Sequence, residues 1–193
     1  MQPDTMLRQR IPTQPGSLYT ELMAHAIGLP NDELFAQMIS AQQGGEGSLP
    51  PGLGLTSDEF SGLLSRHFSS MQLSVYIEEN ETSARTSERE DVRDLLLENR
   101  AGKCESERWL AEIVSVACLA SDHLWQDLGL RSRTYLSQLM TQNFPALAAR
   151  NEHDMKWKKF LYKQLCEREG INACRAPSCE YCVDYLKCFG PEE

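Results

Sequence analysis

The sequence predicts an all-α protein, a single helical domain that ends in an irregular, cysteine-rich metal-binding tail at its C-terminus. Three observations support this prediction. Several segments repeat apolar residues at the spacing of a helix with one buried face. No segment alternates apolar and polar residues over the length that a strand needs. Four of the seven cysteines lie between residues 174 and 188, after the last helical pattern.

Length and charge narrow the class of protein. With 193 residues, of which 41% are hydrophobic, the chain can bury one core of ordinary size. The formal net charge of −9 argues against nucleic acid as a partner, because non-specific nucleic-acid binding depends on basic side chains. No apolar run approaches the roughly 20 residues of a membrane-spanning helix, and residues 1–15 lack the apolar stretch of a signal peptide. We therefore expect a soluble, cytoplasmic protein that binds neither nucleic acid nor membrane.

The N-terminal part is expected to be loosely built. Helical patterns at residues 18–29 and 32–42 are separated by Pro30. Residues 43–55 hold five glycines and two prolines, a composition typical of a linker or mobile loop.

The later helices are marked by their caps and breakers. Thr56 and Glu59 form a capping box that opens one helix, and Ser87 and Glu90 form a second. Gly170 ends the final helical pattern. The expected helices span residues 56–68, 87–100, 106–120, a segment from 132 that carries Leu136, Leu139 and Met140, a short continuation at 145–149, and residues 154–168.

These patterns divide the chain into two parts. Residues 1–55 are expected to form a weakly structured N-terminal region that includes the glycine-rich linker. Residues 56–193 are expected to form the helical domain, with the cysteine-rich tail at 171–193.

The tail carries the clearest chemistry in the sequence. Its four cysteines form the motif C-x4-C-x2-C-x5-C, and they are Cys174, Cys179, Cys182 and Cys188. Thiolates are soft ligands that suit zinc, copper(I) or iron–sulfur clusters. Short, unequal spacings are typical of iron–sulfur cluster loops, whereas zinc ribbons usually pair two C-x2-C knuckles that lie far apart. The motif therefore favours an iron–sulfur type of cluster, and a structural zinc site is the main alternative.

The other three cysteines are weaker candidates for ligands. Cys104 and Cys118 lie within or beside helical patterns, and free cysteines there usually act as small buried hydrophobic residues. Cys166 lies on the last helix, eight residues before Cys174. It is either a core residue, which we favour, or an additional metal ligand.

Two of the four histidines are candidate nitrogen ligands. His123 lies at an expected helix boundary and His153 precedes the last helix. Imidazole binds zinc and iron, although a single histidine more often has a structural role. His25 and His67 receive no role from the sequence.

Three lysines on the last helix form a basic stripe. Lys156, Lys159 and Lys163 follow one another at helical spacing beside the apolar face. A solvated helix face is the common explanation of such a stripe. The alternative, in a chain of net negative charge, is a surface that attracts an anion such as molybdate or docks an acidic partner.

No catalytic motif accompanies these features. The sequence contains no G-x-S-x-G, no H-E-x-x-H and no glycine loop between a strand and a helix that could hold phosphate. We therefore expect a protein that is not an enzyme.

Three blocks of sequence resemble the NifQ family, which supplies molybdenum for the iron–molybdenum cofactor of nitrogenase. One block is the four-cysteine tail, which continues as Phe-Gly-Pro. The second runs from Asp154 to Glu167, and the third runs from Ala117 through Gly129 to the segment at 144–147. The resemblance covers roughly residues 105–190, and the cysteine motif is its signature.

The resemblance implies a specific function. Members of the family are thought to hold a cluster of molybdenum, iron and sulfur and to pass molybdenum to the cofactor-assembly proteins, which include the NifE–NifN scaffold and the nitrogenase iron protein. The cysteines at 174, 179, 182 and 188 match the cluster motif one for one. Spacing alone leaves two alternatives open, a zinc-stabilised interaction module and a simple iron–sulfur electron carrier.

Overall fold

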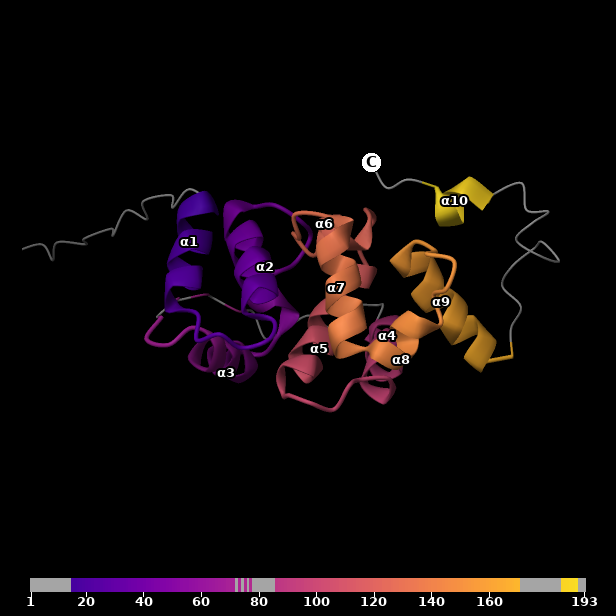
Figure 1. The fold of residues 1–193 in the computed structure, drawn as a ribbon, viewed down its shortest axis with the longest axis horizontal. Coiled ribbons are helices and arrows are strands. Elements are labelled where there is room, and N and C mark those ends of the chain that lie inside the picture. The colour runs from indigo at the N-terminus through magenta and orange to yellow at the C-terminus, as the bar shows by residue number, and fades with distance from the viewer. Residues whose placement is uncertain are drawn as a thin grey trace, which may run out of the picture.

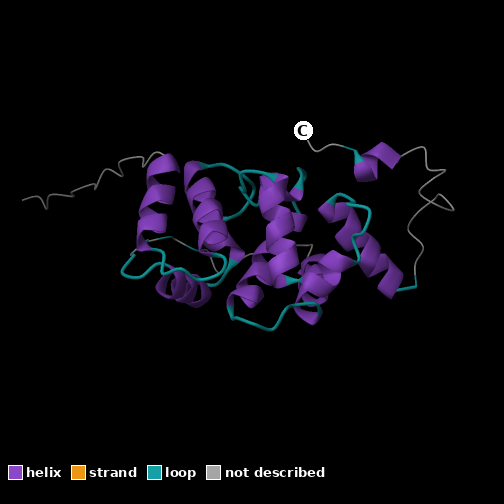
Figure 2. Cartoon of the chain, viewed as in Figure 1, coloured by secondary structure: helices purple, strands orange, loops and turns teal. Residues whose placement is uncertain are grey.

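The chain folds into helices, as the sequence predicts. The structure, a computed structural model, describes residues 15–71, 73, 75, 77, 86–170 and 185–190. Within these ranges no strand occurs, and the only β-type pairing is an isolated bridge between Ala26 and Phe68 (Figure 2). The helices are α1 (Pro15–His25), α2 (Asp32–Gly44), the 3-10 helix η1 (Pro51–Gly54), α3 (Ser57–His67), α4 (Thr86–Glu98), α5 (Ser106–Cys118), α6 (Leu124–Asp127), α7 (Arg133–Asn143), α8 (Pro145–Ala149), α9 (Trp157–Arg168) and α10 (Tyr185–Phe189). None of the described helices is long and apolar enough to cross a membrane.

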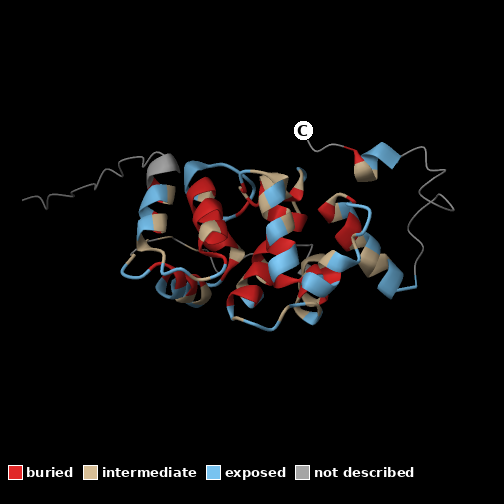
Figure 3. Cartoon of the chain, in the orientation of Figure 1, coloured by how far each residue is buried: buried red, intermediate tan, exposed pale blue. Residues whose placement is uncertain are grey.

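Helix α5 lies at the centre of the arrangement. It packs against α3, η1, α4 and α6, while α1 packs on α2 and α9 packs on α4 (Figure 1). The expected apolar face of α5 is confirmed, because Leu110, Ile113 and Val114 are fully buried. Figure 3 shows such a division clearly along α7, which carries both buried and exposed residues, whereas α2 is buried over most of its length.

Local sequence signals predict the start of α3 correctly and place the start of α4 differently from the structure. The capping box of α3 is confirmed: the Thr56 hydroxyl accepts a hydrogen bond from the Glu59 backbone N–H, and the Glu59 carboxylate accepts one from the Thr56 N–H. Helix α4 instead begins at Thr86. Ser87 therefore lies in the first turn of that helix rather than at the cap.

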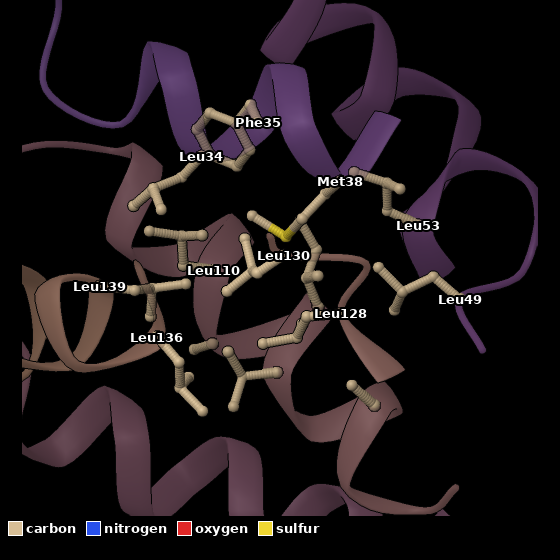
Figure 4. Close-up of a cluster of buried hydrophobic side chains, with 14 of the residues drawn as sticks. Leu34, Phe35, Met38, Leu49, Leu53, Leu110, Leu128, Leu130, Leu136 and Leu139 are labelled. Carbon is tan, nitrogen blue, oxygen red and sulfur yellow. The ribbon is translucent and has the colours of Figure 1, made fainter. Parts of the chain in front are cut away.

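The glycine-rich segment between α2 and α3 packs into the core. Leu49, Leu53 and Leu55 are buried, and Figure 4 shows the first two beside Met38 and Leu128. A Cβ atom on Gly47 would lie 2.9 Å from the carbonyl oxygen of Asp127, so the glycine permits a close backbone approach. Composition predicts a linker here. The structure differs because three leucines among the glycines bury against α2, α5 and α6. The division of the chain at residue 55 stays a prediction.

A buried histidine joins the N-terminal helices to α5. His67 Nδ1 lies 2.6 Å from Asp32 Oδ1, and His67 Nε2 lies 2.7 Å from Ser106 Oγ. Asp32 also accepts hydrogen bonds from the backbone N–H groups of Gly28 and Leu29. Burial lowers the pKa of His67, although the hydrogen bond to Asp32 opposes that shift. The network is closed to solvent, so its role is structural.

The tail contains one described helix. Residues 185–189 form α10, so the expectation of an irregular tail is wrong for this short part. The α10 turn is stabilised by ring stacking between Tyr185 and Phe189, whose centroids lie 4.6 Å apart.

Candidate metal centre

One of the four motif cysteines lies in the described part of the chain. Cys188 is on α10, half-buried, and packs against the hydrophobic core. Cys174, Cys179 and Cys182 lie outside the described residues. The four-cysteine site thus stays a prediction. Its described portion is Cys188 and the residues that hold it in place, which together we call the seat of Cys188.

Cys188 is held at the N-terminal end of α9. The Lys156 backbone N–H donates a 2.8 Å hydrogen bond to the Cys188 carbonyl oxygen, and the Lys156 ammonium lies 3.4 Å from the Leu186 carbonyl oxygen. Lys156 is the N-cap residue of α9, so its N–H has no partner inside that helix. The bond to Cys188 satisfies it.

The turn that presents Lys156 is fixed to the helical body. Arg133, the first residue of α7, donates two hydrogen bonds of 3.0 and 2.9 Å to the carboxylate of Asp154. It also donates to the backbone carbonyl oxygens of Asp154 and Met155. Asn151 closes the turn from the other side, because its amide exchanges hydrogen bonds with the backbone of Met155. Bidentate pairing to a guanidinium gives such a turn a defined geometry.

A buried ion pair fixes α9 itself. Lys158 pairs with Asp127 of α6, whose side chain is fully buried, and Lys158 also donates to the carbonyl oxygen of Ala120. Ser48 donates to the other carboxylate oxygen of Asp127 at 2.5 Å. Lys158 has no distinguishing signal in the sequence because it stands among three other lysines. Arg133 and Asp154 have none because surface charges carry no local pattern. The signal in the sequence is an acidic residue, Asp127, between the apolar Leu124 and Leu128.

The basic stripe divides into different roles. Lys156 belongs to the seat of Cys188, as described. Lys159 is exposed, and Lys163 lies 3.6 Å from Glu167 of its own helix. Only Lys159 and Lys163 are therefore candidates for a docking surface that is independent of the tail.

Cys166 and Cys188 lie at opposite ends of α9. Cys166 is half-buried and follows Lys156 by ten residues, which is about 15 Å along a helix axis. Its alternative role as a ligand stays a prediction. A pocket of about 480 Å³ opens near this end of α9. Arg168 pairs there with Glu98, and Arg150 donates to the side chains of Asn99 and Gln164, so the arginines of this pocket connect α9 to α4 and α8.

The two candidate histidines occupy different surroundings. His153 is exposed, in the turn that leads to Lys156. His123 is half-buried at the start of α6, where its backbone N–H donates to the Gln126 side chain. His153 is thus close in sequence to the seat of Cys188, whereas His123 belongs to the start of helix α6.

Of the two remaining cysteines, Cys118 is a core residue as expected, whereas Cys104 is only half-buried. Cys118 is buried, and burial raises the pKa of its thiol to about 12. It is therefore protonated at neutral pH. Cys104 is half-buried beside Glu107, whose carboxylate accepts hydrogen bonds from the backbone of residues 102–104. Across the described ranges, no three His, Cys, Asp or Glu side chains come together as a metal site.

Comparison with known proteins identifies the family of this chain. The NifQ family model matches residues 34–190, a range that includes all four motif cysteines, most of α2 and the helices α3 to α10. The chain is similar to "Protein NifQ" from Azotobacter vinelandii, with 43% identity over 81% of this chain and 86% of that protein.

Two further relatives show the same similarity. "Protein NifQ homolog" from Sinorhizobium fredii is 40% identical over 77% of this chain and 65% of its own length. "Protein NifQ" from Rhodobacter capsulatus is 34% identical over 93% of this chain and 95% of its own length. No solved structure matches the chain.

Proposed function

Because this chain belongs to the NifQ family, we propose that it is a molybdenum donor for the biosynthesis of the iron–molybdenum cofactor of nitrogenase. Membership itself indicates a role in molybdenum processing for nitrogenase. The proposal goes further and names the cargo, a molybdenum–iron–sulfur cluster, and its ligands, Cys174, Cys179, Cys182 and Cys188.

The observation that supports this proposal most is the four-thiol motif inside the range that matches the family. Four thiolates at short, unequal spacings suit an iron–sulfur core better than a hard cation, which prefers oxygen ligands. The thiol of Cys188 is half-buried but not enclosed, and this degree of exposure fits a carrier whose cargo must leave again.

We propose that the protein is a carrier and not an enzyme. Its residues bind, orient and release cargo without changing a substrate covalently. The proposed partners are molybdate as the source of metal, and the NifE–NifN scaffold and the nitrogenase iron protein as the acceptors. We propose the cytoplasm as the place of this exchange.

The experiment is a molybdenum transfer assay under anaerobic conditions. Protein loaded with iron, sulfide and molybdate is mixed with the acceptor scaffold, and molybdenum is then measured in the re-isolated acceptor. We expect transfer from the native chain and from Cys104→Ala, which keeps the motif. We expect no transfer from Cys179→Ala or Cys182→Ala, although both keep their helical circular dichroism.

Three results would argue for other functions. Equal transfer from Cys182→Ala would show that the motif does not bind the cargo. A colourless protein that holds only zinc would identify a zinc-stabilised interaction module. A protein with iron, sulfide and a reversible redox couple, but without molybdenum after feeding, would identify an electron carrier.

A further inference from the structure

We propose that residues 151–156 form a clasp that seats Cys188 as the fixed ligand of the metal-binding tail, with Arg133, Asp154 and Lys156 as positioning residues. The inference rests on the proposed function for the identity of the cargo. The geometry that supports it comes from described residues alone.

The first part of the argument is the attachment of the clasp to the helical body. Arg133 contacts both the carboxylate and the backbone of Asp154, and it reaches the Met155 carbonyl oxygen as well. Met155 and Trp157 are buried beside these contacts. Asp154 has a φ of +53°, a conformation that aspartate and asparagine adopt more readily than most residues. The clasp therefore has one defined shape relative to α7 and α9.

The second part is the attachment of α10 to the clasp. Lys156 contacts α10 twice, through its N–H to the Cys188 carbonyl oxygen at 2.8 Å and through its ammonium to the Leu186 carbonyl oxygen at 3.4 Å. Phe189 packs against the core, and Gly190 is buried. Four tail residues, Leu186, Cys188, Phe189 and Gly190, are thus held by contacts or burial that do not involve metal.

The consequence concerns metal affinity. A ligand that already lies in place loses less conformational entropy on binding than a ligand on an unconstrained segment. Cys188 is anchored eighteen residues after Gly170, where helix α9 has ended. The clasp thereby holds Cys188, one of the four motif cysteines, in place before metal binds.

Hydrogen exchange tests the clasp directly. The Lys156 amide hydrogen has no helical acceptor, so its protection reports the bond to Cys188 alone. We expect Arg133→Gln to accelerate exchange at Lys156 about tenfold in the metal-free protein, and Asp154→Asn to accelerate it at least threefold. Arg131→Gln is the matched control, because Arg131 stacks on Tyr19 and lies outside the clasp. Exchange at Phe160, which donates to the Lys156 carbonyl oxygen, checks that α9 stays folded.

Cobalt(II) tests whether the clasp positions a ligand. Its thiolate charge-transfer absorption reports tetrathiolate binding without any need for molybdenum. We expect Arg133→Gln and Asp154→Asn to weaken cobalt(II) binding three- to tenfold at an unchanged number of thiolates, while Arg131→Gln keeps the native affinity.

The outcomes separate the inference from the proposed function. Native exchange at Lys156 in both clasp variants would overturn the inference. So would faster exchange with native cobalt(II) affinity, since the clasp would then hold α10 without positioning a ligand. Tight cobalt(II) binding that depends on the clasp, in a protein that never takes up molybdenum, would support the inference and contradict the molybdenum donor.

Discussion

The backbone N–H of Lys156 donates a hydrogen bond of 2.8 Å to the carbonyl oxygen of Cys188. This contact joins the N-cap residue of α9 to the last cysteine of the motif, across 32 positions of the sequence. The start of α9 is thus the platform on which α10 lies (Figure 1).

The buried ion pair between Lys158 and Asp127 should dominate the stability of the platform. Lys158→Met would leave the fully buried Asp127 carboxylate without its counter-ion, and losing one partner of such a pair costs about 3 kcal/mol or more. Chemical denaturation should show this loss in the free energy of unfolding. Lys159→Met, at an exposed position of the same helix, should change it by less than about 0.5 kcal/mol. Equal effects of the two substitutions would contradict this assignment.

The basic stripe should act on association rather than on folding. Lys159→Glu together with Lys163→Glu leaves the seat of Cys188 intact, because Lys156 is unchanged. We expect this pair to slow molybdenum transfer or molybdate loading several-fold at low salt and much less at high salt, since screening weakens interactions between exposed charges. Rates measured in 20 mM and 500 mM salt check this. Transfer and loading that match the native chain at low salt would make the stripe a solvated face only.

The His67 network should make the fold sensitive to acid. Burial lowers the folded-state pKa of His67 below the unfolded value of 6.5, so the unfolded chain takes up this proton first as the pH falls. The contribution of His67 is therefore present above about pH 6.5 and declines below it, by at most about 1.4 kcal/mol per pH unit. Unfolding curves at pH 7.5 and 5.5 should show a smaller decline in His67→Gln than in the native chain. An identical decline would rule out His67 as the sensitive group.

The glycine-rich segment should behave as core. Leu53 is 1% exposed, and Leu53→Ala removes a buried side chain at a cost of about 2–5 kcal/mol in the free energy of unfolding. Ile27→Ala, at a side chain that is 53% exposed, is the comparison and should cost well under 1 kcal/mol. A Leu53 variant as stable as the Ile27 variant would restore the linker interpretation.

Local patterns in the sequence predict the helices well because each signal acts within a few residues. The capping box at Thr56, the apolar face of α5 and the stop at Gly170 all depend on neighbours three or four positions away. The packing of Leu49 and Leu53 does not depend on close neighbours in the sequence. It depends on α5 and α6, which are far away in sequence, so composition alone points to a linker.

The candidate site also has one part that local sequence patterns predict and one part that depends on tertiary contacts. The spacing of the four cysteines predicts a soft-metal motif without a structure. The seat of Cys188 requires Arg133 and Lys156, whose contacts span 21 and 30 residues or more. A run of lysines gives no sign of which member pairs with a buried carboxylate. The sequence therefore does not distinguish Lys158 from Lys159. Burial and pairing decide their roles, and both are properties of the tertiary structure.

The most direct test of the central claim is elemental analysis of the protein purified without oxygen from cells fed molybdate. Iron, acid-labile sulfide and molybdenum should be present together, and all three should be lost when Cys179 or Cys182 is replaced by alanine. Zinc alone, in a colourless protein, would contradict the account and leave the tail as a structural zinc site.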